Sequence, residues 1–172
     1  MPAPLPPLPA GYADRMPRHA EAGAAALVPV GADHAGRPAF LAADAAEAWR
    51  RLRAAAAEEG LALLLVSAFR SHARQEQIVR RKLEQGLPWD EILEVSAYPG
   101  FSEHHTGRAV DVGTAESVDL TGAFERTAEF RWLARHAAAF GFRMSYPRDN
   151  PAGIQYEPWH WAYHGPAPEP SA

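Results

Sequence analysis

Two short polar segments, far apart along the chain, constrain its fold more than any other feature. The first, residues 102–111, reads S-E-H-H-T-G-R-A-V-D, and the second, residues 157–160, reads E-P-W-H. A catalytic zinc site uses three protein ligands, with His nitrogen and Asp oxygen among the preferred donors, and leaves a fourth position for water. His104, Asp111 and His160 offer such a set. The sequence therefore predicts a fold that brings the two segments together around one metal ion.

A second carboxylate accompanies these ligands. Glu157 lies three residues before His160, so an extended strand or a tight turn would place both side chains close to the metal, with Glu157 as a general base. Asp111 falls in an apolar run, and a buried carboxylate is costly unless it is paired or binds a metal. Gly107 allows the backbone to turn tightly between the first two ligands. The alternative is a surface loop that carries an aspartate by chance.

The composition fits a single domain and excludes several kinds of partner and site. The chain has 172 residues, of which 47% are hydrophobic, a fraction that its many alanines raise. Its net charge is −4 and it has no basic stripe, so we expect no nucleic-acid partner. It has no cysteine, so any metal must be held by His and carboxylate groups. We expect a monomer.

The sequence leaves the location of the protein open. Its longest strongly apolar run, Leu61–Val66, is too short to span a membrane. Residues 1–31 lack the charged region and the apolar run of a signal peptide. As written, the sequence favours action inside the cell, whereas removal of a leader would place the same domain in the cell envelope.

Apolar periodicity and capping residues predict short helices and strands. Ala45, Trp49, Leu52 and Ala56 recur at helical spacing after Asp44, which we expect to cap a helix. Helices mixed with short strands, without a regular βαβ alternation, indicate an α+β domain with a small antiparallel sheet. The predicted helices are 44–59, 71–85, 88–94 and 127–140, and the predicted strands are 26–30, 61–68, 109–112, 142–146 and 154–161.

Composition also divides the chain into three parts. Residues 1–38 are rich in Pro and Ala, and we expect an extended segment that wraps the domain or is disordered. Residues 39–165 carry the metal-binding motifs. Residues 166–172 form a Pro-rich tail that we expect to be loose.

The two motifs resemble those of a known enzyme family. The pattern S-x-H-x-x-G-x-A-x-D followed by E-x-W-H resembles the VanY-type zinc D-alanyl-D-alanine carboxypeptidases, which trim the peptide stems of the bacterial cell wall. A third segment, Phe69-Arg70-Ser71 with Gln75 after it, looks like the Y-R-S-x-x-x-Q of that family. The resemblance covers about residues 42–165. It implies the fold shared by Hedgehog signalling domains and D,D-peptidases, and it makes residues 39–165 a zinc peptidase domain.

The resemblance also assigns roles to individual residues. Glu157 would take a proton from water and pass it to the leaving amine. Arg70 would stabilise the oxyanion or hold the carboxylate of the substrate. Ser102 and Gln75 would contact the substrate, a peptidoglycan stem peptide or a small peptide that ends in D-Ala-D-Ala. The expected reaction is removal of the C-terminal D-alanine.

Several alternatives stay open. The same fold occurs in cell-wall endopeptidases and lysins and in zinc-binding modules without activity, although Glu157 disfavours such a module because a structural zinc needs no base. Another divalent metal is also compatible with these ligands. The family pattern assigns the ligand to His104, so His105 is expected to lie behind it or to be exposed. His164, four residues after His160, is expected at the rim.

Overall fold

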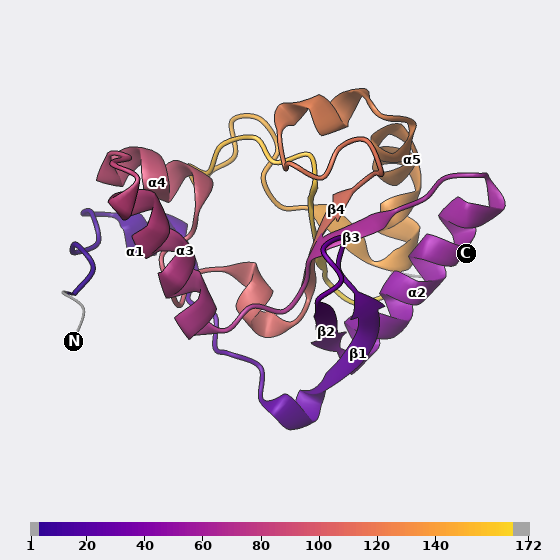
Figure 1. Ribbon diagram of the computed structural model, residues 1–172, viewed down its shortest axis with the longest axis horizontal. Helices are drawn as coiled ribbons and strands as arrows, with labels where there is room; N and C mark the ends of the chain where they lie inside the picture. Colours follow the sequence, from indigo (N-terminus) through magenta and orange to yellow (C-terminus); the bar gives the residue numbers. More distant parts are fainter. Residues whose placement is uncertain (1–3, 167–172) are drawn as a thin grey trace, which may run out of the picture.

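A four-stranded antiparallel sheet forms the centre of the molecule (Figure 1). The computed structural model describes residues 4–166, so all but the first residue of the expected loose tail lies outside the described residues. The strands run in the order β3-β4-β6-β5, and helices surround them, which confirms the predicted α+β class. The strands are β3 (Leu64–Ser67), β4 (Ala109–Gly113), β5 (Phe142–Met144) and β6 (His160–Tyr163).

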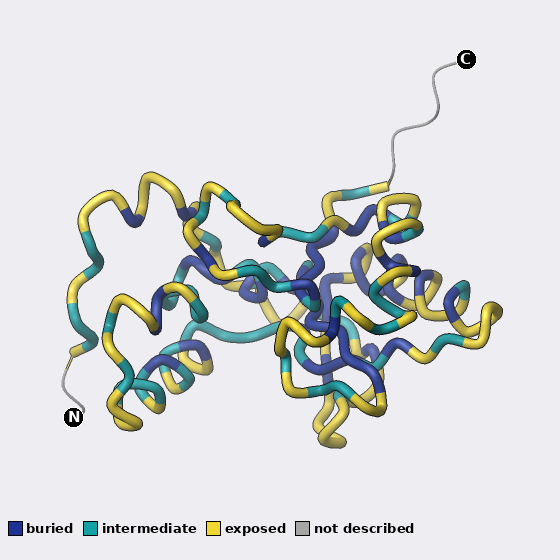
Figure 2. Tube along the Cα trace, turned by 90° about the horizontal axis from the view of Figure 1, so that it is seen from above, coloured by how far each residue is buried: buried dark blue, intermediate teal, exposed yellow. Residues whose placement is uncertain are grey.

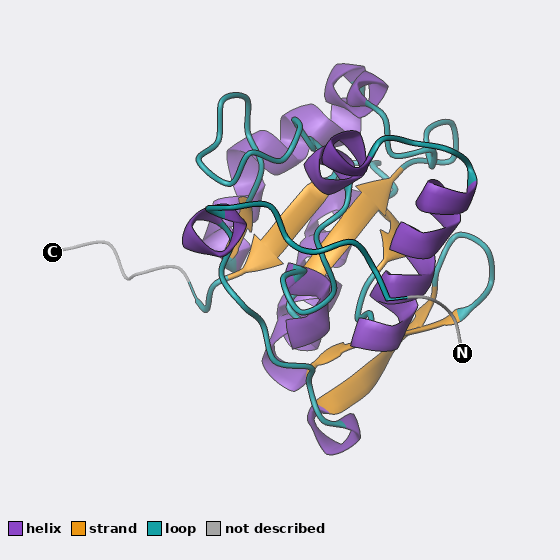
Figure 3. Ribbon diagram, turned by 90° about the vertical axis from the view of Figure 1, so that its left-hand side faces the viewer, coloured by secondary structure: helices purple, strands orange, loops and turns teal. Residues whose placement is uncertain are grey.

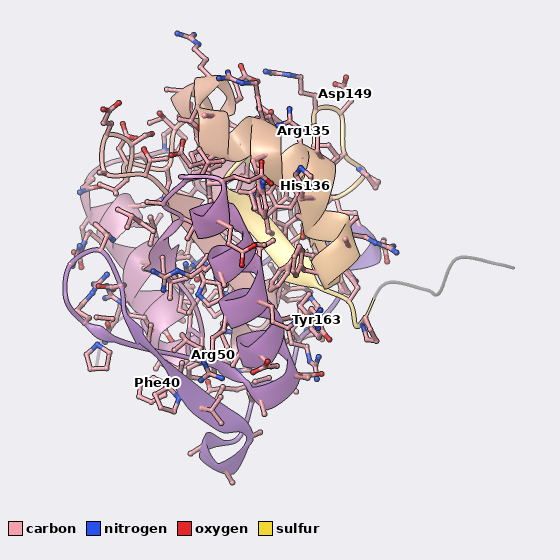
Figure 4. All side chains as sticks on the ribbon, turned by 90° about the vertical axis from the view of Figure 1, so that its right-hand side faces the viewer. Phe40, Arg50, Arg135, His136, Asp149 and Tyr163 are labelled. Carbon is pink, nitrogen blue, oxygen red and sulfur yellow. The ribbon has the colours of Figure 1, made fainter. Side chains whose placement is uncertain are left out.

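The larger hydrophobic core lies on one face of this sheet. Helices α2 (Ala43–Glu58) and α5 (Ala128–His136) contribute their apolar side chains to it, together with Val110 and Val112 of β4. Figure 4 looks onto this side of the molecule and shows α2 and α5 in front of the strands. Because side chains alternate along a strand, Asp111 points to the opposite face.

The opposite side of the sheet carries a second group of helices. Helices α1 (Tyr12–Arg15), α3 (His72–Glu84) and α4 (Trp89–Val95) lie together there, away from α2 and α5 (Figures 1 and 3). A smaller core with Tyr12, Met16, Leu93, Phe101, Tyr146 and Ile154 lies among these elements. None of the described helices is long and apolar enough to cross a membrane.

Two of the predicted helix starts have different outcomes. Ser71 caps α3 as predicted, because its hydroxyl accepts a hydrogen bond from the Arg74 backbone N–H at 3.0 Å. The prediction that Asp44 caps α2 was wrong. The helix begins at Ala43 without a side-chain cap, and the Asp44 carboxylate instead accepts from the Arg108 guanidinium at 2.7 Å. A tertiary ion pair has replaced the local cap.

The chain before β6 differs most from the prediction. The predicted strand over 154–161 was wrong for its first six residues, because only His160 and Trp161 belong to β6. The Glu157 backbone N–H donates to the Tyr146 carbonyl, and the His160 N–H donates to the Glu157 carbonyl at 3.1 Å. Residues 157–160 therefore form a tight turn, the other arrangement that the spacing allows.

Other elements are shorter than predicted or divided. The buried strand predicted over 61–68 is reduced to β3. The helix predicted over 127–140 is divided into α5 and a 3-10 helix, η4 (Ala137–Phe140). The further 3-10 helices are η1 (Ala24–Ala26), η2 (Glu103–Thr106) and η3 (Gly122–Arg126).

The N-terminal part of the chain packs against the rest of the molecule. The edge strand predicted over 26–30 is β1 (Leu27–Ala32), which pairs antiparallel with β2 (Pro38–Ala42), an element that the sequence did not indicate. The Tyr12 ring is fully buried against Phe101 with centroids 5.3 Å apart, and its hydroxyl accepts from the Tyr98 backbone N–H at 3.0 Å. Figure 2 shows such buried positions between exposed stretches of the N-terminal segment.

Tyr12 gives a direct test of this packing. We expect Tyr12→Ala to lower the free energy of unfolding by about 3–5 kcal/mol, as for other large aromatic truncations, because it empties the smaller core. Tyr12→Phe keeps the ring and leaves one buried N–H unpaired, so it should cost about 1–3 kcal/mol. Urea denaturation of both variants measures these values. A Tyr12→Ala variant as stable as the wild type would show that Tyr12 adds nothing to the smaller core.

Candidate metal centre

The three predicted ligands meet on the face of the sheet opposite the larger core. Asp111 on β4 and His160 on β6 are paired across the two central strands, and His104 comes from η2. His104 Nε2 lies 3.1 Å from Asp111 Oδ2, and His160 Nδ1 lies 3.0 Å from Asp111 Oδ1. One donor atom from each residue falls within 4.8 Å of the other two, and all three residues are buried. This set of two imidazoles and one carboxylate fits a single divalent metal ion.

The turn before β4 places His104. The Ser102 hydroxyl accepts from the His104 backbone N–H, and the chain reverses at Gly107, whose φ is +69°. A Cβ on Gly107 would lie 2.8 Å from Leu27 Cδ2 and 2.9 Å from the Ala42 nitrogen. Only glycine fits that approach, which brings the turn against the β1–β2 hairpin.

Hydrogen bonds fix which nitrogen of each histidine faces the centre. His104 Nδ1 lies 2.7 Å from the Ala68 carbonyl oxygen, so it carries the proton and leaves Nε2 free to bind a metal. His160 has the reverse arrangement, because its Nε2 lies 2.7 Å from Glu103 Oε2 and its Nδ1 faces Asp111. Both rings are therefore held in the orientation that a shared metal requires.

Glu103 is the residue at this site that the sequence analysis missed. Its Oε2 atom accepts from both His160 and the Ser145 hydroxyl, the latter at 2.6 Å. Although burial alone would raise its pKa, the hydrogen bond from His160 lowers the pKa of Glu103 to about 2. A carboxylate directly before His104 in the motif was a visible signal, but the sequence could not show that it reaches the other histidine.

Charge within the centre is compensated by close neighbours. Burial by itself raises the pKa of Asp111, but the adjacent imidazoles of His104 and His160 hold it well below its usual range. Arg70 adds a positive group, with Nη2 3.5 Å from Asp111 Oδ2. The carboxylate of Asp111 is therefore ionised and ready to bind a cation.

Glu157 lies beside the ligands without a close hydrogen-bonding partner among the described side chains. Its Oε2 atom is 3.8 Å from His160 Nδ1, and its side chain is 13% exposed. Burial raises the pKa of Glu157 to about 7, and the nearby His160 opposes the shift. The group can therefore take up and release a proton near neutral pH.

Arg70 is fixed in place by its neighbours. Nη1 donates to Gln75 Oε1 at 2.7 Å, and Nη2 donates to Ser67 Oγ at 2.9 Å. Gln75 in turn donates from Nε2 to the Ala97 carbonyl at 2.6 Å. Both ends of the Gln75 amide are thus used within the protein, so its direct contact with a substrate stays a prediction.

A cleft of about 520 Å³ opens above the three ligands. Arg70, Gln75, Ser102 and Glu157 all line it, as do the three ligands. A cleft of this size is typical of small-molecule and peptide sites.

The two neighbouring histidines lie outside the ligand set. His105 is fully buried behind the centre, where Nδ1 donates to the Arg70 carbonyl at 2.6 Å and Nε2 accepts from the Gly100 N–H. It therefore supports the backbone of Arg70. His164 is exposed after β6 and does not join the described ligand group.

Comparison with known proteins identifies a family. The sequence model described as "VanY: D-alanyl-D-alanine carboxypeptidase" matches residues 38–166. The Bacillus subtilis (strain 168) protein named "Putative carboxypeptidase YodJ" is 36% identical over 130 residues, which cover 73% of this chain and 47% of that protein. The chain thus spans about half the length of this relative.

Solved structures resemble the chain over most of its length. The LD-carboxypeptidase LdcB has a TM-score of 0.74 at 32% identity, covering 84% of this chain and 70% of that one. A mutant of the vancomycin-resistance D,D-pentapeptidase VanY in complex with Zn(II) has a TM-score of 0.64 at 26% identity, covering 92% of this chain and 83% of that one. These similarities confirm the fold that the motifs implied.

The ligand assignment predicts the metal content of a variant. We expect the wild type to bind one divalent metal ion per chain and His160→Ala to lose it, because two remaining donors do not hold a catalytic metal. Elemental analysis after dialysis measures this, with His164→Ala as the matched histidine control. Full metal occupancy in His160→Ala would overturn the assignment.

The contact between Glu103 and His160 predicts that different substitutions of Glu103 weaken metal binding to different degrees. Partners that orient a metal-binding histidine typically contribute about 10–100-fold in affinity, so Glu103→Ala should weaken zinc binding by that factor. Glu103→Gln keeps an acceptor for His160 Nε2 and should lose less. Competition with a zinc chelator measures the affinities, and Glu91→Ala, at an exposed position on α4, controls for the loss of one charge. Equal affinity in Glu103→Ala and Glu91→Ala would show that Glu103 does not position His160.

Proposed function

Because the chain belongs to the VanY family of D-alanyl-D-alanine carboxypeptidases, we propose that it is a zinc-dependent carboxypeptidase. Its substrates are peptidoglycan stem peptides or their precursors, from which it removes the C-terminal D-alanine. The observation that supports this most is the position of Glu157 beside three converging metal donors in a cleft lined by Arg70.

His104, Asp111 and His160 are the residues that hold the zinc ion. When bound there, zinc polarises the scissile carbonyl and lowers the pKa of a water molecule. The protein contributes the rigid arrangement of the donors: His104 is tied to the Ala68 carbonyl, and His160 is tied to Glu103.

Glu157 acts as the general base. Its carboxylate takes a proton from the attacking water and later gives it to the leaving amine of D-alanine. A base is most effective when its pKa lies near the working pH, and the pKa of Glu157 is raised to about 7 by burial. A bound cation nearby would attract the ionised carboxylate and lower that pKa.

Arg70 supplies a positively charged guanidinium group to the site. Held by Ser67 and Gln75 next to Asp111, its guanidinium can stabilise the developing oxyanion or pair with the substrate carboxylate. Ser102 lines the same cleft and offers a hydroxyl for substrate binding. Gln75 contributes to substrate binding indirectly, because it fixes the orientation of Arg70.

Of the two alternative functions, the non-catalytic zinc module receives less support, and the endopeptidase differs in the substrates that it would accept. A non-catalytic zinc module would not need a carboxylate such as Glu157, which is largely buried in the cleft and whose pKa lies near neutrality. An endopeptidase would accept chain on both sides of the cleaved bond, so it would not distinguish a free from a blocked C-terminus.

The role of Glu157 predicts both a mutant effect and a pH profile. Glu157→Gln should retain zinc and the fold while kcat falls by about 10²–10⁴, the usual contribution of a general base. In the wild type, kcat/KM should rise with pH through the Glu157 pKa, at or below about 7, because the base acts when deprotonated. Steady-state kinetics between about pH 5 and 8, the range in which proteins are usually most stable, measures this. A Glu157→Gln variant with wild-type turnover would place the base elsewhere.

Mass spectrometry on four peptides tests the reaction itself. The peptides are a stem ending in D-Ala-D-Ala, the same stem with an amidated terminus, the stem shortened by one D-alanine, and an all-L control. We expect release of alanine from the first alone, since a buried group that pairs with a free carboxylate rejects substrates lacking it. Cleavage of the shortened stem instead would indicate an L,D-carboxypeptidase. Equal cleavage of the amidated stem would favour an endopeptidase.

A further inference from the structure

Lys82 is a positive group in the cleft that the proposed mechanism does not use. It belongs to α3, lines the same cleft as Arg70 and Glu157, and is only partly exposed. Its ammonium group makes no hydrogen bond or ion pair with any residue in the described range 4–166, whereas the nearby Arg80 of the same helix pairs with Glu76. Glu157 is close enough to attract the Lys82 ammonium electrostatically but forms no ion pair with it. The ammonium can therefore still bind an anionic group of the ligand.

The position of Lys82 relative to the metal donors can be followed along α3. Gln75, Ile78 and Lys82 all line the cleft, and their spacing of three and four residues puts them on one face of the helix. Gln75 is at the metal end, because it holds Arg70, whose guanidinium lies 3.5 Å from Asp111. Lys82 is seven residues further on, about 10 Å along the helix axis. An extended peptide covers that distance in about three residues.

The direction of the substrate follows from the proposed reaction. A carboxypeptidase leaves a single residue on the C-terminal side of the bond it cleaves. A group two to three residues away from the metal must therefore contact the N-terminal part of the peptide. The residue next to Lys82 is then the one that precedes the terminal D-alanyl-D-alanine.

Building on the proposed function, we propose that Lys82 is a specificity residue that binds a carboxylate on the side chain preceding D-Ala-D-Ala. The Lys82 ammonium donates to that carboxylate, while Ile78 provides an apolar surface between it and Arg70. The enzyme therefore prefers stem peptides with an acidic residue at this position over neutral or basic ones. Lys82 does not touch the reacting atoms.

A set of three short peptides and three variants tests this inference. The peptides are N-acetyl-X-D-Ala-D-Ala in which X is glutamate, its amide isostere glutamine, or lysine. The variants are Lys82→Ala, Lys82→Glu and, as the matched control, Arg81→Ala, which removes the same charge from an exposed neighbour that does not line the cleft. For each enzyme the ratio of kcat/KM between peptides is measured. A ratio cancels any general effect of Lys82 on Glu157, whose pKa it helps to lower.

We expect the wild type and Arg81→Ala to prefer glutamate over glutamine by about tenfold, equivalent to about 1.4 kcal/mol for one charge-assisted hydrogen bond. Lysine should be the poorest substrate. Lys82→Ala should abolish the preference, and Lys82→Glu should invert it in favour of lysine. Equal ratios in wild type and Lys82→Ala, whatever the absolute rates, would overturn the inference.

A binding measurement separates this inference from the proposed function. Titration calorimetry with zinc-loaded Glu157→Gln, which should not turn the peptides over, measures their dissociation constants directly. Tighter binding of the glutamate peptide that depends on Lys82 would support the subsite even if the wild type cleaved none of the three, a result that would count against the proposed reaction alone. Equal binding of all three peptides would overturn the subsite while leaving the reaction intact.

Discussion

The structure depends on a buried carboxylate held between two imidazoles. Asp111 contacts His104 with one oxygen and His160 with the other, and Arg70 stands 3.5 Å away. An ionised carboxylate in a protein interior is stable only when it is paired with positive groups or binds a cation. The antiparallel register of β4 and β6 provides this pairing, because it sets Asp111 directly opposite His160. The register of the sheet therefore determines the geometry of the metal centre.

Segments outside the two central strands keep this arrangement rigid. Glu103 holds His160 and is itself held by Ser145 near the end of β5, so one hydrogen-bonded chain connects η2, β6 and β5. The Ala68 carbonyl after β3 holds His104, and His105 holds the backbone of Arg70. The N-terminal segment continues this support, since the Ala22 N–H donates to the His105 carbonyl. Residues 4–37 precede the family match, and this hydrogen bond ties their segment to the residues that support the site.

Much of the site could be predicted from the sequence because its chemistry is local. His104 and Asp111 lie on one turn and strand, and Glu157 and His160 on another turn, so residue type and spacing pointed to them, and the family pattern selected His104 over His105. Glu103 could not be assigned, because its partner is 57 residues away and no spacing rule relates the two. The prediction for Asp44 was wrong for a similar reason. Capping is a local preference, whereas the Asp44 carboxylate pairs with Arg108, which is distant in the sequence. Strand β6 also begins later in the chain than predicted because of a tertiary contact. The Glu157 backbone N–H donates to the Tyr146 carbonyl.

We propose that the fold holds one zinc ion between three fixed donor atoms. Anomalous diffraction at the zinc absorption edge, on crystals of the zinc-loaded protein, tests it most directly. We expect a single peak about 2.0–2.1 Å from His104 Nε2 and His160 Nδ1 and about 2.0–2.2 Å from a carboxylate oxygen of Asp111. A peak bound through His160 Nε2 or His105, or no peak in the cleft of a folded protein, would contradict it.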